Sequence, residues 1–281
     1  TGNYSPRNPV GSHYGSIGRN TQLRVRTPTA GSNHMLLNGG DPLNVEGWSS
    51  YASTPDVAAL DVTGDIDVRV DGEPRTWRPP GNYGLAQKWV QADPVAFSRS
   101  WQFYLTPTGF LVFVWTTAGT LGSLLTAIST VAVPSTPGRL VVRATLDVDN
   151  GAAGRDIVFY TAPTLGGTYT QLGATVTQAG TTSIYSGTGL LDVGRVITDD
   201  PSEVMQGKVY AARVRAPIGG TVLAGPDFDT QDSGTTSFID AQSRTWTLRG
   251  SAVMVHAGAR MHGEVSSWPP KWDKAPNGDA W

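Results

Sequence analysis

The chain has 281 residues, and its 21 Lys and Arg against 23 Asp and Glu give a formal net charge of −2. This balance offers no basic surface for a phosphate backbone, which argues against nucleic acid as a partner. The absence of cysteine excludes a disulfide framework and thiolate metal sites. The longest apolar runs, such as 109–115, fall far short of the ~20 residues of a membrane-spanning helix, so no membrane span is expected.

Apolar and polar residues alternate along 65–72, which predicts a half-buried antiparallel strand. Ile66, Val68 and Val70 would share the buried face. The charged residues between them, Asp67 among them, would lie on a face exposed to water. The 34 glycines and 19 prolines indicate many such short segments joined by turns.

The segment 101–115 predicts a hairpin that turns at 107–109 and is apolar on both faces. Trp101 and Phe103 alternate with Tyr104 along the first strand. A strand pair of this kind is buried on two sides or lines a groove.

A second hairpin is predicted where Asn150 and Gly151 join 139–150 to the next apolar run, because Asn-Gly readily supplies positive φ. A short helix is expected at 199–207, with Pro201 near its first position. The remaining strand candidates are spaced as in a sandwich and lie at 86–91, 125–133, 168–176, 182–187, 208–216 and 244–250.

Both ends of the chain are rich in loops, with one short strand candidate each, at 22–26 and 261–265. Because an unpaired strand leaves backbone donors and acceptors without partners, we expect these two strands to meet in one small sheet. Val25 and Val265 would lie in that sheet, and the side chains covering it would be Trp268 and Trp272.

Several segments resemble a known family. NYSPRNPVGSHYGSIGRNTQLRVR (3–26) and RMHGEVSSWPPKWD (260–273) resemble segments that flank an inserted domain in minor tail proteins of phages infecting actinobacteria. The middle of the chain, including 53–70, 100–115 and 139–160, resembles the laminin G-like or concanavalin A-like jelly roll of those proteins.

The resemblance implies an all-β, antiparallel jelly-roll sandwich (concanavalin A-like lectin/glucanase type) over 45–255. Segments 1–44 and 256–281 would belong to an interrupted tail domain. It also implies a place in the virion tail, with other phage tail proteins and host cell-wall glycan as partners, and it allows a homotrimer in the tail tip. Adhesion to host carbohydrate is the expected function, a purely structural decoration is the alternative, and a glycoside hydrolase is the third reading.

Hydrolase activity is disfavoured by the acidic residues. Glycosidases of this fold carry Glu-x-Asp-x-x-Glu on one strand, since two carboxyl groups must flank the glycosidic bond. The motif is absent here, and the four glutamates are isolated from one another: Glu46, Glu73, Glu203 and Glu264. We therefore predict that the chain is not an enzyme.

Two acidic segments are candidates for calcium. The run from Asp147 lacks the Gly and Glu of an EF-hand loop, having Ala152 and Val158 at those positions, so a hairpin turn is favoured there. The better candidate is the set Asp227, Asp229 and Asp232, since resemblance to laminin G-like domains implies calcium at a loop edge.

Aromatic side chains are the candidates for sugar binding, because a pyranose face stacks on a flat ring. Trp89, Trp101, Tyr104 and Trp115 are expected on the side of the first hairpin, although tryptophan more often fills a core. We select Tyr104 and Trp115, followed by Trp89, on the expectation that they lie off the face of Trp101 and Phe103.

Overall fold

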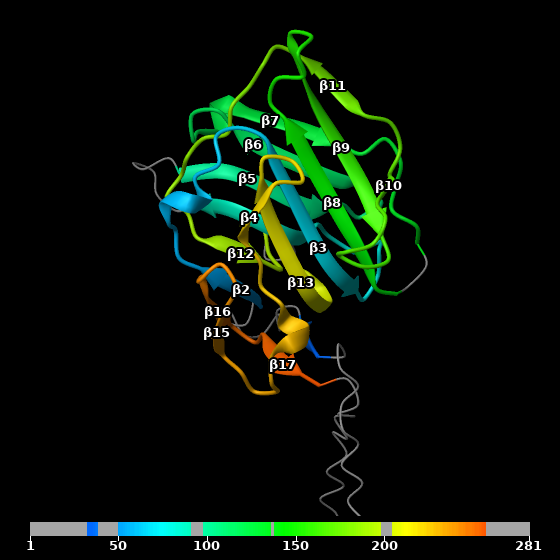
Figure 1. The fold of residues 1–281 in the computed structure, drawn as a ribbon. Coiled ribbons are helices and arrows are strands. Elements are labelled where there is room, and N and C mark those ends of the chain that lie inside the picture. The colour runs from blue at the N-terminus through cyan, green and yellow to red at the C-terminus, as the bar shows by residue number, and fades with distance from the viewer. Residues whose placement is uncertain (1–32, 39–49, 91–97, 136–137, 198–203, 257–281) are drawn as a thin grey trace, which may run out of the picture.

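The computed structural model describes residues 33–38, 50–90, 98–135, 138–197 and 204–256. Two antiparallel sheets pack face to face, with the strands of one crossing behind those of the other (Figure 1). The helices within the described residues are short 3-10 turns: η1 Ala58–Leu60, η2 Leu121–Ser123 and η4 Phe228–Thr230. The predicted all-β jelly-roll sandwich is confirmed, and no helix among these residues is long and apolar enough to cross a bilayer.

Sheet A has the strand order β10-β9-β8-β3-β13-β1-β17, with β11 added to β9 and β14 added to β13. Its strands are β1 His34–Asn38, β3 Ile66–Pro74, β8 Leu140–Asp147, β9 Gly154–Ala162, β10 Thr170–Gln171, β11 Val176–Ala179, β13 Gln206–Ala216, β14 Thr221–Ala224 and β17 Val253–Val255.

Sheet B has the strand order β15-β16-β2-β12-β4-β5-β6-β7. Its strands are β2 Tyr51–Thr54, β4 Tyr83–Val90, β5 Ser98–Leu105, β6 Leu111–Thr116, β7 Leu124–Ile128, β12 Leu191–Val193, β15 Ser237–Ile239 and β16 Thr245–Arg249.

The core lies between the two sheets and is built by the alternation seen in the sequence. Ile66, Val68 and Val70 of β3 point inward, as do Phe103 and Phe113 of sheet B, and all five are buried. Each such side chain contributes about 1.5–3 kcal/mol to folding by leaving water.

Both predicted hairpins are present. The β5–β6 hairpin turns through Gly109, whose φ of +83° is disfavoured for other residues. The β8–β9 hairpin turns through Gly151, and the side chain of Asn150 accepts hydrogen bonds from the backbone of Ala152 and Gly154. The turn at 147–154 is thus held by its own side chains.

The two ends of the described sandwich lie side by side. β1 pairs antiparallel with β17, Met35 opposite Met254, and the side chains of Asn33 and His256 are 2.5 Å apart. Because β1 also pairs with β13, the sandwich begins before residue 45, the boundary expected from the sequence. The interrupted tail domain stays a prediction, since Val25, Val265, Trp268 and Trp272 lie outside the described residues.

Two other segments differ from expectation or escape it. Residues 182–187 form no strand, because the backbone N–H groups of Ile184 and Tyr185 donate to two separate parts of the chain, Thr63 in a loop and Thr116 at the end of β6. The helix expected at 199–207 falls mainly on residues 198–203, which are not described, and β13 has begun by Gln206.

Candidate functional site

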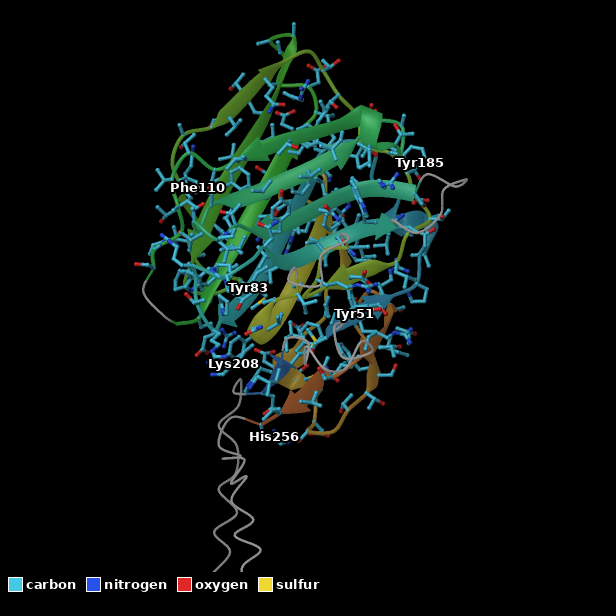
Figure 2. All side chains as sticks on the ribbon, turned by 180° about the vertical axis from the view of Figure 1, so that it is seen from behind. Tyr51, Tyr83, Phe110, Tyr185, Lys208 and His256 are labelled. Carbon is cyan, nitrogen blue, oxygen red and sulfur yellow. The ribbon has the colours of Figure 1, made fainter. Side chains whose placement is uncertain are left out.

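Two of the three predicted sugar-binding residues lie together on the side of sheet B that faces away from the core. There Trp89 contacts Val112 and Val114, and Tyr104 and Ile197 pack against them. Trp89 is only 3% exposed and has no ring face open to a sugar, which contradicts the prediction for it, whereas Tyr104 is half-buried. We call this side the sheet B outer face, and Figure 2 shows the molecule with that side toward the viewer.

The prediction for Trp115 is wrong. Trp115 lies directly opposite Trp101 in the β5–β6 ladder, and residues opposite each other point to the same side of a sheet. It is therefore a core residue, 0% exposed, with its ring 6.2 Å from that of Phe113 and its Nε1 donating to the Thr182 hydroxyl at 3.1 Å. A ring in this position has no face for a sugar.

The sheet B outer face carries a row of polar side chains that the sequence analysis missed. Gln102, Gln87, Asp192 and Ser53 lie opposite one another on β5, β4, β12 and β2. Gln102 donates to Gln87 at 3.1 Å, and Gln87 donates to Asp192 at 2.9 Å. The signal was present, since Gln87 and Gln102 interrupt strands that are otherwise largely apolar.

Beside this row, two arginines flank Tyr51. The Arg195 guanidinium lies 3.5 Å from the centre of the Tyr51 ring, and its Nε donates to Asp192 at 2.9 Å. Arg249 lies opposite Tyr51 in the β2–β16 ladder and donates from Nε to the Ser53 hydroxyl at 3.1 Å. We call Tyr51, Ser53, Asp192, Arg195 and Arg249 the arginine cluster.

Gly84 lets the backbone of Arg195 and Val196 pack closely against β4. A Cβ on Gly84 would come within 2.0 Å of the backbone of Arg195 and Val196, so no other residue fits there without moving that segment. The segment is also tied down by Gly194, whose N–H donates to the Leu85 carbonyl at 3.0 Å. The position of Arg195 is therefore fixed by backbone contacts.

Burial governs the electrostatics of the arginine cluster. It raises the pKa of Asp192, which is 0% exposed, and this effect exceeds the opposing influence of Arg195 and Gln87. Burial likewise raises the pKa of Tyr51, against the influence of Arg195. The Oδ1 atom of Asp192 is buried and accepts no hydrogen bond within the described part of the chain, which adds to the cost of its charge.

The outer face of sheet A is also charged, but its charges are paired. Asp67 receives two hydrogen bonds each from Arg69 and Arg143, at 2.6–3.0 Å, and Asp71 receives two from Arg139. Asp67 is 0% exposed, which corrects the expectation that this face is solvated. Burial tends to raise the pKa of Asp67, but the hydrogen bonds from Arg69 and Arg143 hold it below its ordinary value.

The three aspartates proposed for calcium are not brought together as a metal site. Asp227 pairs with Arg213, Asp229 lies 3.8 Å from Arg139, and Asp232 is exposed in a turn. Among the described residues, no three His, Cys, Asp or Glu side chains are arranged to hold a metal ion. Calcium at this loop stays a prediction.

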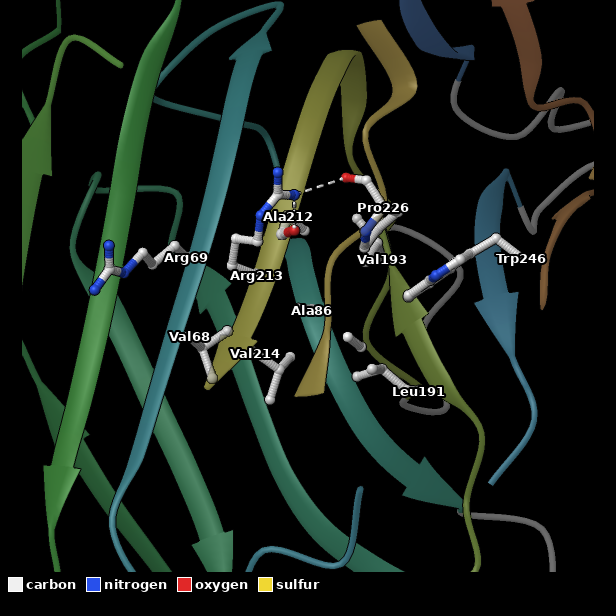
Figure 3. A pocket seen from close by; sticks show the side chains of 11 residues that line it. Val68, Arg69, Ala86, Leu191, Val193, Ala212, Arg213, Val214, Pro226 and Trp246 are labelled. Carbon is white, nitrogen blue, oxygen red and sulfur yellow. Dashed lines mark hydrogen bonds between the residues drawn. The ribbon is translucent and has the colours of Figure 1, made fainter. Parts of the chain in front are cut away.

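Three hollows lie away from the arginine cluster. Figure 3 shows one between the sheets, bordered by Val68, Ala86, Leu191 and Trp246, which has essentially no room for a water molecule. The second, about 360 Å³, lies where β1, β3 and β13 meet. The third, about 340 Å³, is bordered by 59–65 and 216–223. The last two are open to solvent, and neither is lined by Tyr104 or Trp89.

The sequence matches no protein-family model and no curated protein. Among solved structures, it is similar to the CBM40 domain of a Ruminococcus gnavus intramolecular trans-sialidase bound to α2,3-sialyllactose. That likeness has a TM-score of 0.40 and 13% identity, over 59% of this chain and 85% of that one.

Two further structures show similar likenesses. Domains LG4-5 of the mouse laminin α1 chain have a TM-score of 0.40 and 11% identity, over 76% of this chain and 53% of that one. The leech intramolecular trans-sialidase has a TM-score of 0.36 and 12% identity, over 69% of this chain and 28% of that one. Likenesses this remote assign neither a ligand nor a residue role to this chain.

Proposed function

We propose that the chain is a non-catalytic module that binds carbohydrate through the sheet B outer face. One observation carries the proposal: the half-buried rings of Tyr104 and Tyr51 share a face with Arg195, which is partly exposed, and Arg249, which is exposed. Sugar recognition needs this combination, because the ring faces are apolar and the hydroxyl groups require hydrogen-bonding partners.

The non-catalytic part of the proposal rests on the acidic residues. Glu73 is held by Lys208 at 3.1 Å and by the Tyr210 hydroxyl at 2.7 Å. The other three glutamates lie outside the described residues. The motif with two carboxyl groups that glycosidases of this fold use is absent from the sequence.

We further propose that the module belongs to the tail tip of a phage infecting actinobacteria, next to other tail proteins and facing the host cell wall. The resemblance of 3–26 and 260–273 to tail-protein segments supports this. The pairing of β1 with β17 is compatible with it, since an inserted module must leave its host domain and return to it at neighbouring points.

A structural decoration without glycan binding is the second candidate. It is favoured by a group of apolar side chains on and around β7 that are 38–58% exposed: Leu121, Leu124, Ile128 and Val131. Exposed apolar groups of this kind can mark a contact with another protein. If this reading holds, the sheet B outer face would have no affinity for glycans.

The test is binding of the full chain to a glycan array and to isolated actinobacterial cell walls. We expect Tyr104→Ala to weaken glycan binding about tenfold, which corresponds to about 1.4 kcal/mol, with little loss of stability. Tyr185→Ala serves as the matched control, because Tyr185 (labelled in Figure 2) lies in the segment 182–187 and not on a strand of sheet B. Absence of any glycan binding, or equal loss in both variants, would refute this proposal.

A further inference from the structure

The arginines of the two sheets use their guanidinium groups differently. On sheet A, Arg69, Arg143 and Arg139 each donate from both Nε and Nη2 to the two oxygens of one carboxylate. This side-on fork is the strong geometry for an arginine and a carboxylate. In the arginine cluster, the hydrogen bonds of Arg195 and Arg249 to other described residues come from Nε alone.

The two cluster arginines therefore retain binding capacity. Within the described residues, the Nη atoms of Arg195 and Arg249 donate to no protein acceptor. Arg195 is partly exposed and Arg249 is exposed, so a ligand can reach both. A guanidinium is planar and always charged, so the free Nη groups of each arginine can still donate to a planar anion.

The arginine cluster has a net charge of about +1, which one negative charge on a ligand would neutralise. Around Tyr51 there are two cations, Arg195 and Arg249, and one carboxylate, Asp192. Asp192 is fully buried beneath this surface. Of the donor groups of Arg195, it accepts a hydrogen bond from Nε and leaves the Nη groups free. A single added carboxylate balances the charge, whereas a dianionic phosphate would exceed it.

We propose that the arginine cluster binds the carboxylate of an acidic saccharide, such as a uronic or nonulosonic acid, between Arg195 and Arg249, with the sugar beside Tyr51. This inference rests on the glycan binding proposed above and specifies the charge class of the sugar. Ser53 and Gln87 are buried beneath this surface and support it, because Ser53 accepts from Arg249 and Gln87 donates to Asp192. Neutral sugars lack the anionic group that the Nη groups of both arginines would bind.

The test is a glycan array carrying carboxylated oligosaccharides, their methyl esters, their neutral counterparts and phosphorylated oligosaccharides, probed with the full chain. We expect the carboxylated forms to bind best and methyl esterification to weaken binding at least tenfold, because the ester removes the charge but keeps the ring. Raising the salt concentration should weaken this binding and leave any binding of neutral sugars nearly unchanged.

Arg249→Gln tests the cluster directly, since Arg249 is exposed and its loss should leave the fold intact. We expect a tenfold or greater loss of affinity for the carboxylated glycans, and partial recovery in Arg249→Lys, which restores the charge without the fork. Arg75→Gln removes the same charge from an exposed position outside the cluster and should change nothing. Thermal melting of each variant confirms that it is folded.

The outcomes separate this inference from the proposed function. If neutral or methyl-esterified glycans bind as tightly as the acids, or if Arg249→Gln behaves like Arg75→Gln, the module binds sugar but the arginine cluster does not select a carboxylate. Preference for phosphorylated oligosaccharides overturns the carboxylate assignment. If no glycan binds at all, the proposed function itself fails.

Discussion

The outer faces of the two sheets carry similar residue types but arrange them in opposite ways. On sheet A, Asp67 accepts bidentate hydrogen bonds from two arginines, and Asp71 accepts them from one. The charged groups there are therefore paired with one another. On sheet B, Asp192 receives one arginine Nε and one amide, and one of its oxygens accepts no hydrogen bond in the described part of the chain. The closed network stabilises the fold, whereas on sheet B the Nη groups of Arg195 and Arg249 bond to none of the described residues and can still bind a ligand.

The pKa values of the two central aspartates follow this difference. Burial acts to raise the pKa of both Asp67 and Asp192, but the net shifts differ. For Asp67 the hydrogen bonds from two arginines outweigh burial, and the pKa falls below its ordinary value. For Asp192 burial prevails and the pKa is raised. The number of donors aimed at each carboxylate thus decides the sign.

A change in the core beneath both faces sets the scale for all other variants. Trp115→Ala should destabilise the chain by about 3–5 kcal/mol, because it removes a fully buried ring and leaves a cavity. Urea denaturation of the full chain measures this cost. Tyr104→Ala, on the outer face of the same hairpin, should cost far less, and equal costs would show that Tyr104 is a core residue too.

Asp67→Asn tests the closed face. It should destabilise the chain by about 3 kcal/mol, because it leaves two largely buried arginines, Arg69 and Arg143, without their counter-charge. Asp232→Asn, at an exposed aspartate, should be nearly neutral in the same urea experiment. A neutral result for Asp67→Asn would mean that the sheet A network does not contribute to stability.

The same residue predicts a dependence on pH. Because the folded-state pKa of Asp67 is lowered, its contribution to stability is present above its ordinary unfolded pKa and disappears as the pH falls through the folded value. The full chain should therefore lose stability in acid, below about pH 4. In Asp67→Asn this acid-dependent loss should be smaller, which melting curves across that range will show.

The strands and hairpins could be predicted because their signals are local. Alternation along β3 and β8 and the glycines of both turns depend only on neighbouring residues. The inward position of Trp115 could also have been predicted. A turn centred on Thr108 pairs residues at equal distances before and after it, which places Trp115 opposite Trp101.

Which residues pair in the polar row and in the closed network could not be predicted, because these pairs join remote strands. Gln87 and Asp192 are 105 positions apart, and their pairing depends on the order of strands in sheet B. The burial of Asp67 depends on distant segments, since Gly219 donates to it and Tyr169 lies beneath the guanidinium of Arg69, 4.8 Å away. The alternation of apolar and polar residues along β3, taken alone, predicts that Asp67 is exposed to solvent.

Asp192→Asn gives the smallest effect on stability and the sharpest contrast with Asp67. Because burial raises the folded-state pKa of Asp192, protonation favours the folded chain, and this gain is lost as the pH rises through the raised value. At neutral pH the buried charge is costly, so its neutral replacement should change stability by no more than about 1 kcal/mol despite losing the charge of the Arg195 pair. Unlike Asp67→Asn, it should therefore lose little at neutral pH, and its stability relative to the wild type should fall as the solution is acidified. Melting curves of both variants across the acid range measure this difference. If Asp192→Asn were as damaging at neutral pH as Asp67→Asn, the sheet B outer face would be a closed structural network like that of sheet A, and the case for a ligand there would be lost.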